Sequence, residues 1–330
     1  MALESKYPTL LDITRAMDPD GSIAAVAEIL AETNEMLLDI PFLEGNLTTG
    51  HRTTIRTGLP EPTFRMFYGA VQPTKSTRVQ VTDSTAMLED YAEIDKAEAD
   101  LNGNSAAFRL SEDTAHIEGM SQKAQQSFIY GSSALNPEQF NGLAPRFNSL
   151  SADNAENILD GGGTGTDNGS IWLICWAPDT CFGIYPKGSQ AGLHMEDKGQ
   201  LTKQNADGNG GMYEIYLTHY RWDLGLVVRD WRFVVRIANI DRSALTADAS
   251  AGANLPNLMF EAVERLSLIK GNCAFYMDRR MMTKLRQQIA AGVSNSTLST
   301  EQVGGVRVTS FDGIPIRRTD KLAVDEAQVT

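Results

Sequence analysis

Apolar residues recur at helical spacing over two stretches in the first half of the chain. Residues 22–40 carry an interrupted apolar stripe that starts after Ser22, and serine is a common N-terminal cap of helices. Residues 84–131 carry the longest helical pattern, with a break near residues 101–105. The side chains of this second stretch that we expect on helical spacing are Ala107, Leu110, Ala115, Ile117, Met120, Ala124, Phe128 and Ile129.

Two shorter helices are predicted in the last third of the chain. The first covers residues 255–269, with Pro256 in its first turn. Its expected apolar side is formed by Leu258, Ala262, Leu266 and Ile269. The second covers residues 277–292, where Asp278 is the expected N-cap and Gly292 the expected end. Its inward side chains are expected to be Met281, Met282, Leu285 and Ile289.

Strands are predicted in three places. The continuous run IWLICWA at residues 171–177 is typical of a buried strand. Residues 230–240 alternate, and an extended chain turns alternate side chains to opposite faces. The side chains expected on the inner face of that strand are Trp231, Phe233, Val235 and Ile237. Residues 306–320 predict a hairpin, because Asp312 and Gly313 suit a two-residue turn.

Residues 45–82 follow a different pattern. They are rich in threonine, and segments such as HRTTIRT and TRVQVT alternate with polar residues on both faces. This pattern predicts a long β-hairpin. A pair of strands without a buried face is poorly stable alone. We therefore expect a neighbouring subunit to cover this surface.

Composition and charge exclude some classes of protein. Of the 330 residues, 42% are hydrophobic and 22% are charged, which suits a globular protein with a real core. The formal net charge of −13 opposes a protein whose whole body is held on nucleic acid, although it leaves room for a local basic patch. The first residues lack the apolar segment of a secretory signal, and the longest apolar run is too short to cross a membrane.

One arginine-rich and tryptophan-rich stretch, residues 216–241, raises the question of a polyanion groove. A stacking platform for bases needs aromatic and cationic side chains on the same exposed face. In the predicted strand, Trp231 falls on the face opposite to Arg232 and Arg236. We therefore favour a structural strand whose arginines pair with carboxylates, within the subunit or between subunits.

Candidate catalytic and metal-binding residues are few. The loop DGGGTGTDNGS at residues 160–170 precedes a strand, whereas a phosphate-binding loop follows a strand and opens a helix. Glu112 and His116 lie one helical turn apart, which suits a solvated pair better than a metal site. A nucleophile using Cys175 or Cys181 with His194 or His219 stays open, although Cys175 lies in the buried run. All three cysteines are expected to be reduced. We predict no catalytic, cofactor-binding or metal-binding residue.

Four segments carry a resemblance to a known family. They are NPEQFNGLAPRFN at 136–148, HYRWDLGLVVRDWRFVVRIANID at 219–241, FYMDRRMMTKLRQQ at 275–288 and DGIPIRRTDKL at 312–322. In this order they resemble the major capsid proteins of tailed bacteriophages of the short-tailed, podovirus type.

The resemblance implies an α+β chain with the HK97-like capsid fold. That fold has a long spine helix, a β-rich peripheral domain, a compact axial domain and an extended β-hairpin loop. By this likeness, residues 1–44 would be an N-terminal arm and helix, and residues 45–82 the inter-subunit loop. Residues 83–144 would form the spine helix and peripheral domain, and residues 145–305 mainly the axial domain. Residues 306–330 would be a C-terminal hairpin that returns to the peripheral domain.

The resemblance also implies a function, that of a structural subunit and not an enzyme. Copies would self-assemble through hexamers and pentamers into an icosahedral head that encloses double-stranded DNA, without a cofactor. Expected partners are other copies of the chain, a scaffold, cementing or portal protein, and packaged DNA in non-specific contact, with no membrane. The expected location is the virion, after assembly in the cytoplasm of the bacterial host. The alternatives are an encapsulin-like nanocompartment shell and a cysteine hydrolase.

Overall fold

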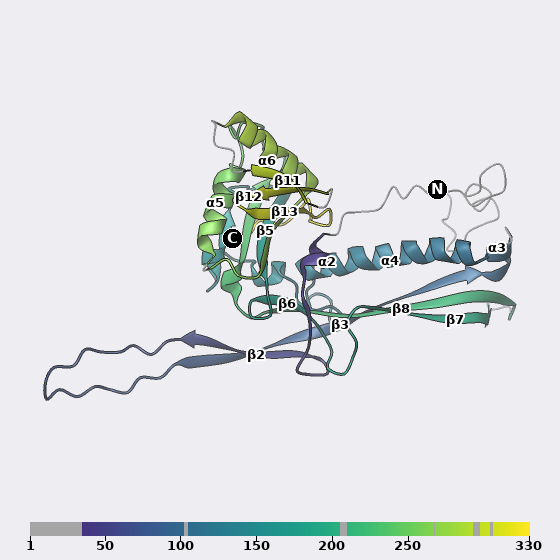
Figure 1. The fold of residues 1–330 in the computed structure, drawn as a ribbon, viewed down its shortest axis with the longest axis horizontal. Coiled ribbons are helices and arrows are strands. Elements are labelled where there is room, and N and C mark those ends of the chain that lie inside the picture. The colour runs from purple at the N-terminus through teal and green to yellow at the C-terminus, as the bar shows by residue number, and fades with distance from the viewer. Residues whose placement is uncertain (1–34, 102–104, 205–209, 267, 293–297, 304–305) are drawn as a thin grey trace. The chain divides into compact units, whose positions relative to one another are not determined.

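The structure is a computed structural model that describes residues 35–101, 105–204, 210–266, 268–292, 298–303 and 306–330 (Figure 1). The expected N-terminal arm and most of the helix predicted over 22–40 lie outside the described residues. At the described end of that helix, Met36–Asp39 form the short helix α2. The chain divides into two units. Unit 1 contains Met87–Lys123 and Gly192–Trp222, and unit 2 contains the other described residues.

Unit 1 is a small sheet with helical segments. Its elements in chain order are the second half of β3 (Thr77–Asp95), α3 (Lys96–Asp100), the first part of α4 (Ser105–Tyr130), β7 (Leu193–Gln204) and the first part of β8 (Met212–Val228). β7 and β8 pair antiparallel, with Leu193 opposite Trp222 at one end and Gln204 opposite Met212 at the other. Ala92, Met120 and Tyr220 form a small buried apolar cluster in unit 1.

The helix predicted over 84–131 starts later than expected. β3 continues to Asp95, and Ala92 and Ile94 are buried at the two-residue period of a strand. The Asp95 carboxylate accepts a hydrogen bond from the backbone N–H of Ala97 at 2.7 Å and caps α3. The prediction was therefore wrong for residues 84–95, where the many Ala, Glu and Leu side chains favour a helix by propensity but pairing in the sheet prevails.

The apolar spacing of α4 predicts its buried face only in the second half of the helix. Met120, Ala124, Phe128 and Ile129 are buried, as expected. Leu110, in the first half, is 68% exposed. In the isolated subunit, this part of α4 therefore presents apolar surface to water.

Unit 2 holds most of the chain. Its strands are β1 (Phe42–Glu44), β2 (Gly50–Gly58), the first half of β3, β4 (Ile158–Asp160), β5 (Asn168–Trp176), β6 (Cys181–Tyr185), the end of β8, β9 (Val234–Asp241), β10 (Asn272–Met277), β11 (Leu298–Val303), β12 (Val306–Phe311) and β13 (Ile314–Arg318). Its helices are α2, the end of α4, α5 (Leu255–Arg265) and α6 (Arg279–Ala291), with 3-10 turns η1 (Ala144–Arg146), η2 (Ala155–Asn157) and η3 (Trp231–Phe233). No helix within the described ranges has the length and apolar character needed to span a membrane.

The core of unit 2 is built around β5. Every residue of β5 is buried, which confirms the buried strand predicted at 171–177. β5 pairs antiparallel with β10 on one side and with β9 on the other, and β13 continues the sheet in parallel beside β10. Side chains of α5 and α6 complete the core, with Met259, Ala262, Met281 and Leu285 among the most buried.

Caps and turns in unit 2 follow the sequence closely. Asn254 caps α5 and Pro256 lies in its first turn, while Asp278 accepts a hydrogen bond from the backbone of Arg280 and caps α6. In the hairpin of β12 and β13, Asp312 and Gly313 have φ angles of 50° and 78°, as a two-residue turn of this type requires. The predictions for Pro256, Asp278 and the Asp312-Gly313 turn are confirmed. One side chain of the predicted helix 255–269 was misplaced, because α5 ends at Arg265 and Ile269 is 58% exposed.

The strand predicted over 230–240 begins at Val234. Residues Trp231–Phe233 form a 3-10 turn, in which the Asp230 carboxylate accepts a hydrogen bond from the backbone of Arg232. Trp231 is therefore only half-buried and is not aligned with the inner face of the strand, so this part of the prediction was wrong. Arg236 lies within β9 and is buried, because both faces of β9 are covered.

A buried polar network fastens the last residues of the chain to β5 and β9. The Arg236 guanidinium lies 2.8 Å from the Glu326 carboxylate, and each side chain is only 5% exposed. Ser170 also donates a hydrogen bond to Glu326, and Tyr130 donates one at 2.5 Å. Burial and the neighbouring Glu326 raise the pKa of Tyr130 well above its ordinary value. The phenol therefore stays protonated and remains a donor.

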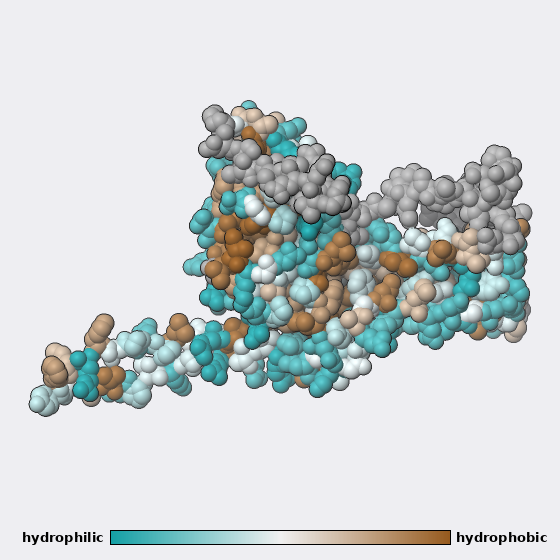
Figure 2. Space-filling view, in the orientation of Figure 1, coloured by the Kyte–Doolittle hydropathy of each residue, from teal (hydrophilic) through white to brown (hydrophobic). Residues whose placement is uncertain are grey.

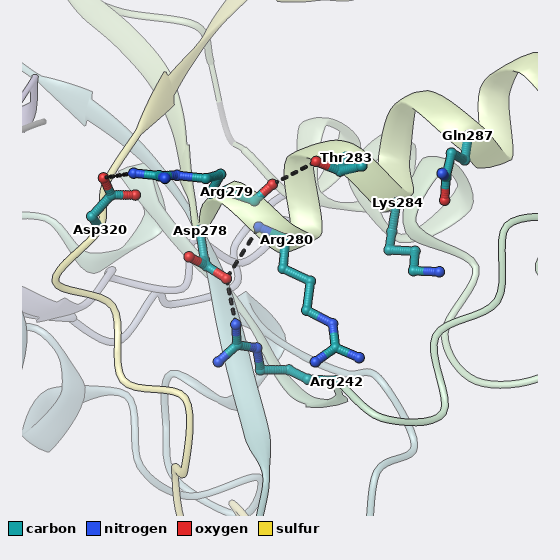
Figure 3. Close-up of a pocket in the computed structure, with 8 residues that line it drawn as sticks. All are labelled: Arg242, Asp278, Arg279, Arg280, Thr283, Lys284, Gln287 and Asp320. Carbon is teal, nitrogen blue, oxygen red and sulfur yellow. Dashed lines mark hydrogen bonds and ion pairs between the residues drawn. The ribbon is translucent and has the colours of Figure 1, made fainter.

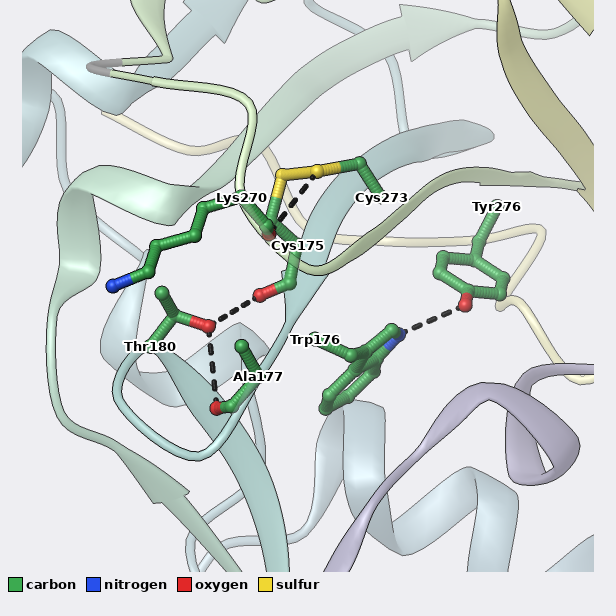
Figure 4. Close-up of a disulfide and its surroundings, with 7 residues drawn as sticks. All are labelled: Cys175, Trp176, Ala177, Thr180, Lys270, Cys273 and Tyr276. Carbon is green, nitrogen blue, oxygen red and sulfur yellow. Dashed lines mark hydrogen bonds between the residues drawn. A yellow bond between two sulfur atoms is a disulfide. The ribbon is translucent and has the colours of Figure 1, made fainter.

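Two cysteines that the sequence analysis expected to be reduced form a disulfide. Cys175 on β5 lies opposite Cys273 on β10 in the strand register, and their sulfur atoms are bonded (Figure 4). Cys181 is a buried free thiol. The expectation of reduced cysteines was therefore wrong for the pair. Sequence alone could not reveal the pairing, because it depends on the register of two strands 98 residues apart.

We predict that Glu326→Ala lowers the free energy of unfolding by about 3–5 kcal/mol, because it leaves the buried Arg236 without its carboxylate. Chemical denaturation of the purified subunit measures the change. Glu264→Ala is the matched control, because this glutamate is exposed and its loss should change stability by less than about 0.5 kcal/mol. Equal effects of the two substitutions would contradict the role of the network.

We predict that only one of the three cysteines reacts with a thiol reagent when the protein is unfolded without reductant, and that all three react after reduction. Thiol titration in denaturant gives both counts. Three reactive thiols before reduction would show that Cys175 and Cys273 are not bonded in the purified protein.

Candidate assembly interface

A hairpin formed by β2 and the first half of β3 projects from the body of unit 2 (Figure 1). Its strands pair antiparallel from Gly50 opposite Ser84 to Gly58 opposite Thr77, which confirms the β-hairpin predicted within residues 45–82. No side chain of residues 54–58 or 77–81 is buried. The outer part of the hairpin therefore has no core of its own.

Apolar side chains stand in water where the two strands of the hairpin are joined. The relative exposures of Phe64, Met66, Phe67 and Tyr68 are 109%, 84%, 93% and 106%. These four residues are called the apolar tip below. Figure 2 shows hydrophobic residues at this end of the hairpin, beside hydrophilic ones. Large apolar side chains gathered on a surface mark a site of contact with another molecule.

The apolar tip has a defined turn. The backbone N–H of Gly69 donates a hydrogen bond to the carbonyl oxygen of Met66 at 3.1 Å. Tyr68, which lies between Met66 and Gly69, has a φ of 64°. This is the left-handed region of the backbone, which residues other than glycine, asparagine and aspartate rarely adopt. A turn of this kind fixes the directions in which the neighbouring aromatic rings leave the backbone.

The apolar tip was not predicted from the sequence. The prediction of polar residues on both faces of the whole hairpin was wrong at residues 64–68, whose sequence is FRMFY. The sequence feature that could have revealed the tip is the presence of four large apolar side chains within five residues, between Pro62 and Gly69. No strand or helix is predicted beside this segment that could cover them. Such a cluster cannot be buried within its own hairpin.

The base of the hairpin is tied to the body of unit 2. The Arg146 guanidinium on η1 lies 2.8 Å from the Asp83 carboxylate on β3, and Asp83 is 6% exposed. Burial raises the pKa of Asp83 above its ordinary value, while the positive charge of Arg146 opposes this rise. The two strands approach closely at Gly50, where an added Cβ would lie 2.0 Å from the Asp83 carbonyl oxygen. The ion pair thus fixes where the hairpin leaves the body.

A cavity of about 630 Å³ lies beside the outer half of β2. One wall is formed by residues 54–59, and the other by Asp153, Asp179 and residues 229–232, including the half-buried Trp231. Arg232 is paired with Asp230, at 2.7 Å between Nη2 and Oδ2. The arginine-rich stretch therefore presents both positive and negative side chains to this cavity, and the charge of Arg232 is already paired with Asp230.

Of the residues weighed as catalytic or metal-binding candidates, Cys175 and His116 have other partners and Cys181 is a buried thiol. Cys175 is bonded to Cys273, and burial raises the pKa of the Cys181 thiol far above its ordinary value, which disfavours a thiolate. His116 Nδ1 lies 2.6 Å from the Asp90 carboxylate. Among the residues that the structure describes, no three His, Cys, Asp or Glu side chains are grouped as a metal site would require.

Comparison with known proteins identifies the family. A family described as major capsid protein GP7 matches residues 18–330. The chain belongs to this family. A solved structure of bacteriophage epsilon15 is similar over 100% of both chains, with 38% sequence identity and a TM-score of 0.76. This capsid protein therefore has the HK97-like fold that the sequence resemblance implied, and it is a shell subunit of a phage virion. Its role is structural, and its copies associate with one another into capsomers.

Weaker likenesses extend to other shells. The capsid of bacteriophage JBD30 is 9% identical, with 89% of this chain and 93% of that chain covered and a TM-score of 0.48. The encapsulin SrpI of Synechococcus elongatus PCC 7942 is 10% identical, with 64% and 89% covered and a TM-score of 0.40. Likenesses at this level carry no argument about function. No curated protein sequence matches the chain significantly.

We predict that Arg146→Ala destabilises the subunit by about 3–5 kcal/mol, because it leaves the buried Asp83 carboxylate without its cation. Asp83→Ala should cost less, since Arg146 is 21% exposed and keeps the carbonyl oxygens of Asn141, Gly142 and Leu226 as acceptors. Denaturant unfolding of the two variants and of the double variant tests the asymmetry. A larger loss from Asp83→Ala than from Arg146→Ala would contradict it.

Proposed function

We propose that this capsid protein forms hexamers and pentamers that close into an icosahedral head around double-stranded DNA. The observation that carries the proposal beyond family membership is the apolar tip. Its four side chains are exposed in the isolated subunit, and no side chain is buried in the outer part of the hairpin that bears them, residues 54–58 and 77–81. Rotational symmetry in a ring of subunits uses contacts between two different patches. A projecting tip that meets a different surface on the next subunit suits this geometry.

We assign roles to the segments on the same basis. Residues 45–82 act as the loop that reaches a neighbour, and α4 within residues 83–144 is the spine helix. Residues 145–305 form mainly the axial domain, residues 306–330 return to the peripheral domain, and residues 1–44 form an N-terminal arm and helix. Each contact is modest, but a closed shell repeats it in every copy.

The burial of the apolar tip supplies a driving force for association. Full burial of one phenylalanine side chain is worth about 1.5–3 kcal/mol relative to its exposure to water. The tip holds two phenylalanines, a methionine and a tyrosine. Ordering the loop against a neighbour costs conformational entropy, which this burial offsets.

The remaining partners and the place of assembly are part of the proposal. The subunit has no enzymatic activity, and packaged DNA touches it without sequence specificity, in keeping with the net charge of −13. A scaffold, cementing or portal protein completes the particle. Assembly takes place in the cytoplasm of the bacterial host without a membrane.

We predict that Phe64→Ser combined with Phe67→Ser leaves a folded subunit that does not form closed shells. Because both rings are in water in the subunit, its melting temperature should stay near that of the unchanged protein. Its association should be lost, because the contact loses most of its apolar area. Thermal unfolding of the subunit and electron microscopy of the assembly reaction give the two readings.

The matched control is Glu61→Ser combined with Gln72→Ser, which makes the same number of substitutions in the same segment at exposed polar positions. The control variant should give particles of normal size. Normal particles from the phenylalanine variant would refute the role of the tip. Particles filled with protein cargo in place of DNA would favour the nanocompartment alternative.

A further inference from the structure

A basic cavity of about 500 Å³ lies along the outer side of α6, away from the apolar tip in the sequence and on different elements of unit 2. Its lining residues are Arg242, Asp278, Arg279, Arg280, Thr283, Lys284, Gln287 and Asp320 (Figure 3). Four of these side chains are cationic and two are anionic. The cavity is therefore locally positive on a subunit whose net charge is −13.

The two carboxylates in this cavity are already engaged. Asp278 Oδ2 lies 2.5 Å from Arg242 Nη2 and accepts the backbone N–H of Arg280 at 3.2 Å, as the cap of α6. Asp320 Oδ2 lies 2.9 Å from Arg279 Nη2 and 2.6 Å from Arg318 Nη2. Arg242 is therefore paired one to one with Asp278, whereas Arg279 shares the single charge of Asp320 with Arg318.

Among the described residues, the other two cations of the cavity have no such partner. Arg280 and Lys284 lie at i and i+4 on α6, and Figure 3 shows their side chains leaving the helix on the same side, near Arg242. Within the described part of the chain, no carboxylate lies within ion-pair distance of either charge. Like charges at this spacing destabilise a helix by a few tenths of a kcal/mol. The repulsion between Arg280 and Lys284 thus destabilises α6, and an anion bound to both would remove this destabilisation.

One more donor near the cavity is unused. The Nε of Arg242 is buried and has no hydrogen-bond partner among the described residues, although Nη2 of the same group holds Asp278. An arginine fork and a lysine ammonium together match the oxygen atoms of a phosphate group, since the fork offers paired donors and the ammonium a compact charge. Thr283 and Gln287 add neutral hydrogen-bonding groups to the lining.

We infer that this cavity binds a phosphate group, with Arg280 and Lys284 as its direct charge partners. The site depends on side chains, because the N-terminus of α6 is already capped by the Asp278 carboxylate. Its volume exceeds that of a single phosphate and leaves room for a group attached to it. Inorganic phosphate and the phosphodiesters of DNA share the chemistry that the site recognises.

The test is phosphate binding to the full-length chain, measured by titration calorimetry at constant ionic strength. Arg280→Gln combined with Lys284→Gln should weaken binding by at least about tenfold, because two charge-assisted contacts are lost. We expect the melting temperature of the unchanged protein to rise when phosphate replaces chloride in the buffer. The two substitutions together should abolish this rise. Both substitutions are on the outer side of α6, away from its buried residues Met281, Leu285 and Gln288.

The matched control is Lys75→Gln combined with Lys187→Gln, which removes the same charge from two exposed lysines outside the cavity. The control should bind phosphate as the unchanged protein does. Phosphate also stabilises proteins by exclusion from their surface. An equal melting shift in all three proteins, without measurable binding, would overturn the inference.

A second arm distinguishes the sources of phosphate. A short DNA duplex, followed by fluorescence anisotropy, should bind the unchanged chain and be displaced by inorganic phosphate if phosphodiesters enter the cavity. Binding of phosphate without binding of DNA assigns the site to small phosphate compounds. Failure of both probes refutes the site. Particle formation by the Arg280 and Lys284 variant is scored separately, so that loss of phosphate binding with normal shells leaves the proposed function intact.

Discussion

A hairpin that is only two strands wide has no interior in which to place its own large side chains, and this constraint shapes the whole subunit. Phe64, Phe67 and Tyr68 remain in water until another molecule covers them. The subunit must therefore obtain its stability elsewhere, and it does so around β5, whose residues are all buried. Because the outer hairpin contributes no core, its sequence is free to serve a contact between copies.

The connection between body and hairpin is electrostatic as well as apolar. Arg146 and Asp83 meet at the point where β3 leaves the body, and the burial of Asp83 makes the loss of Arg146 costly. In the same way, Arg236 and Glu326 hold the last residues of the chain against β5 and β9. Buried pairs of this kind specify position more than they add stability, since desolvation cancels much of their attraction. They determine where each projecting segment begins.

Local chemistry made part of the fold predictable from sequence. Asp278, Pro256 and the Asp312-Gly313 turn act through their own backbone, so their structural effect can be read without knowing the rest of the molecule. Residues 84–95 could not be read in this way, because their propensity favours a helix and only pairing in the sheet makes them a strand.

The candidate interface was predictable in outline and not in its decisive residues. The alternating, threonine-rich pattern of residues 45–82 indicates a hairpin that needs a partner, but alternation within the strands gives no information about FRMFY between them. Trp231 was misplaced for a related reason. A 3-10 turn capped by Asp230 precedes β9, whereas the prediction assumed that side chains alternate between the two faces from residue 230 onward. The cavity beside α6 depends on Arg242 and Asp320, which are far from α6 in the sequence.

The apolar tip and the basic cavity beside α6, both on unit 2, differ in how charge affects what they can bind. Copies with a net charge of −13 repel one another, and salt at physiological strength limits that repulsion to about 8 Å. An apolar tip suits such a subunit, because its attraction does not depend on the sign of the surface that it meets. Arg280 and Lys284 differ from the tip in this respect, because cations without a carboxylate partner among the described residues attract anions and select them by geometry. Association through the tip should therefore persist as salt rises, whereas phosphate binding beside α6 should weaken, and this difference in salt dependence would distinguish the two contacts even in an assembled shell.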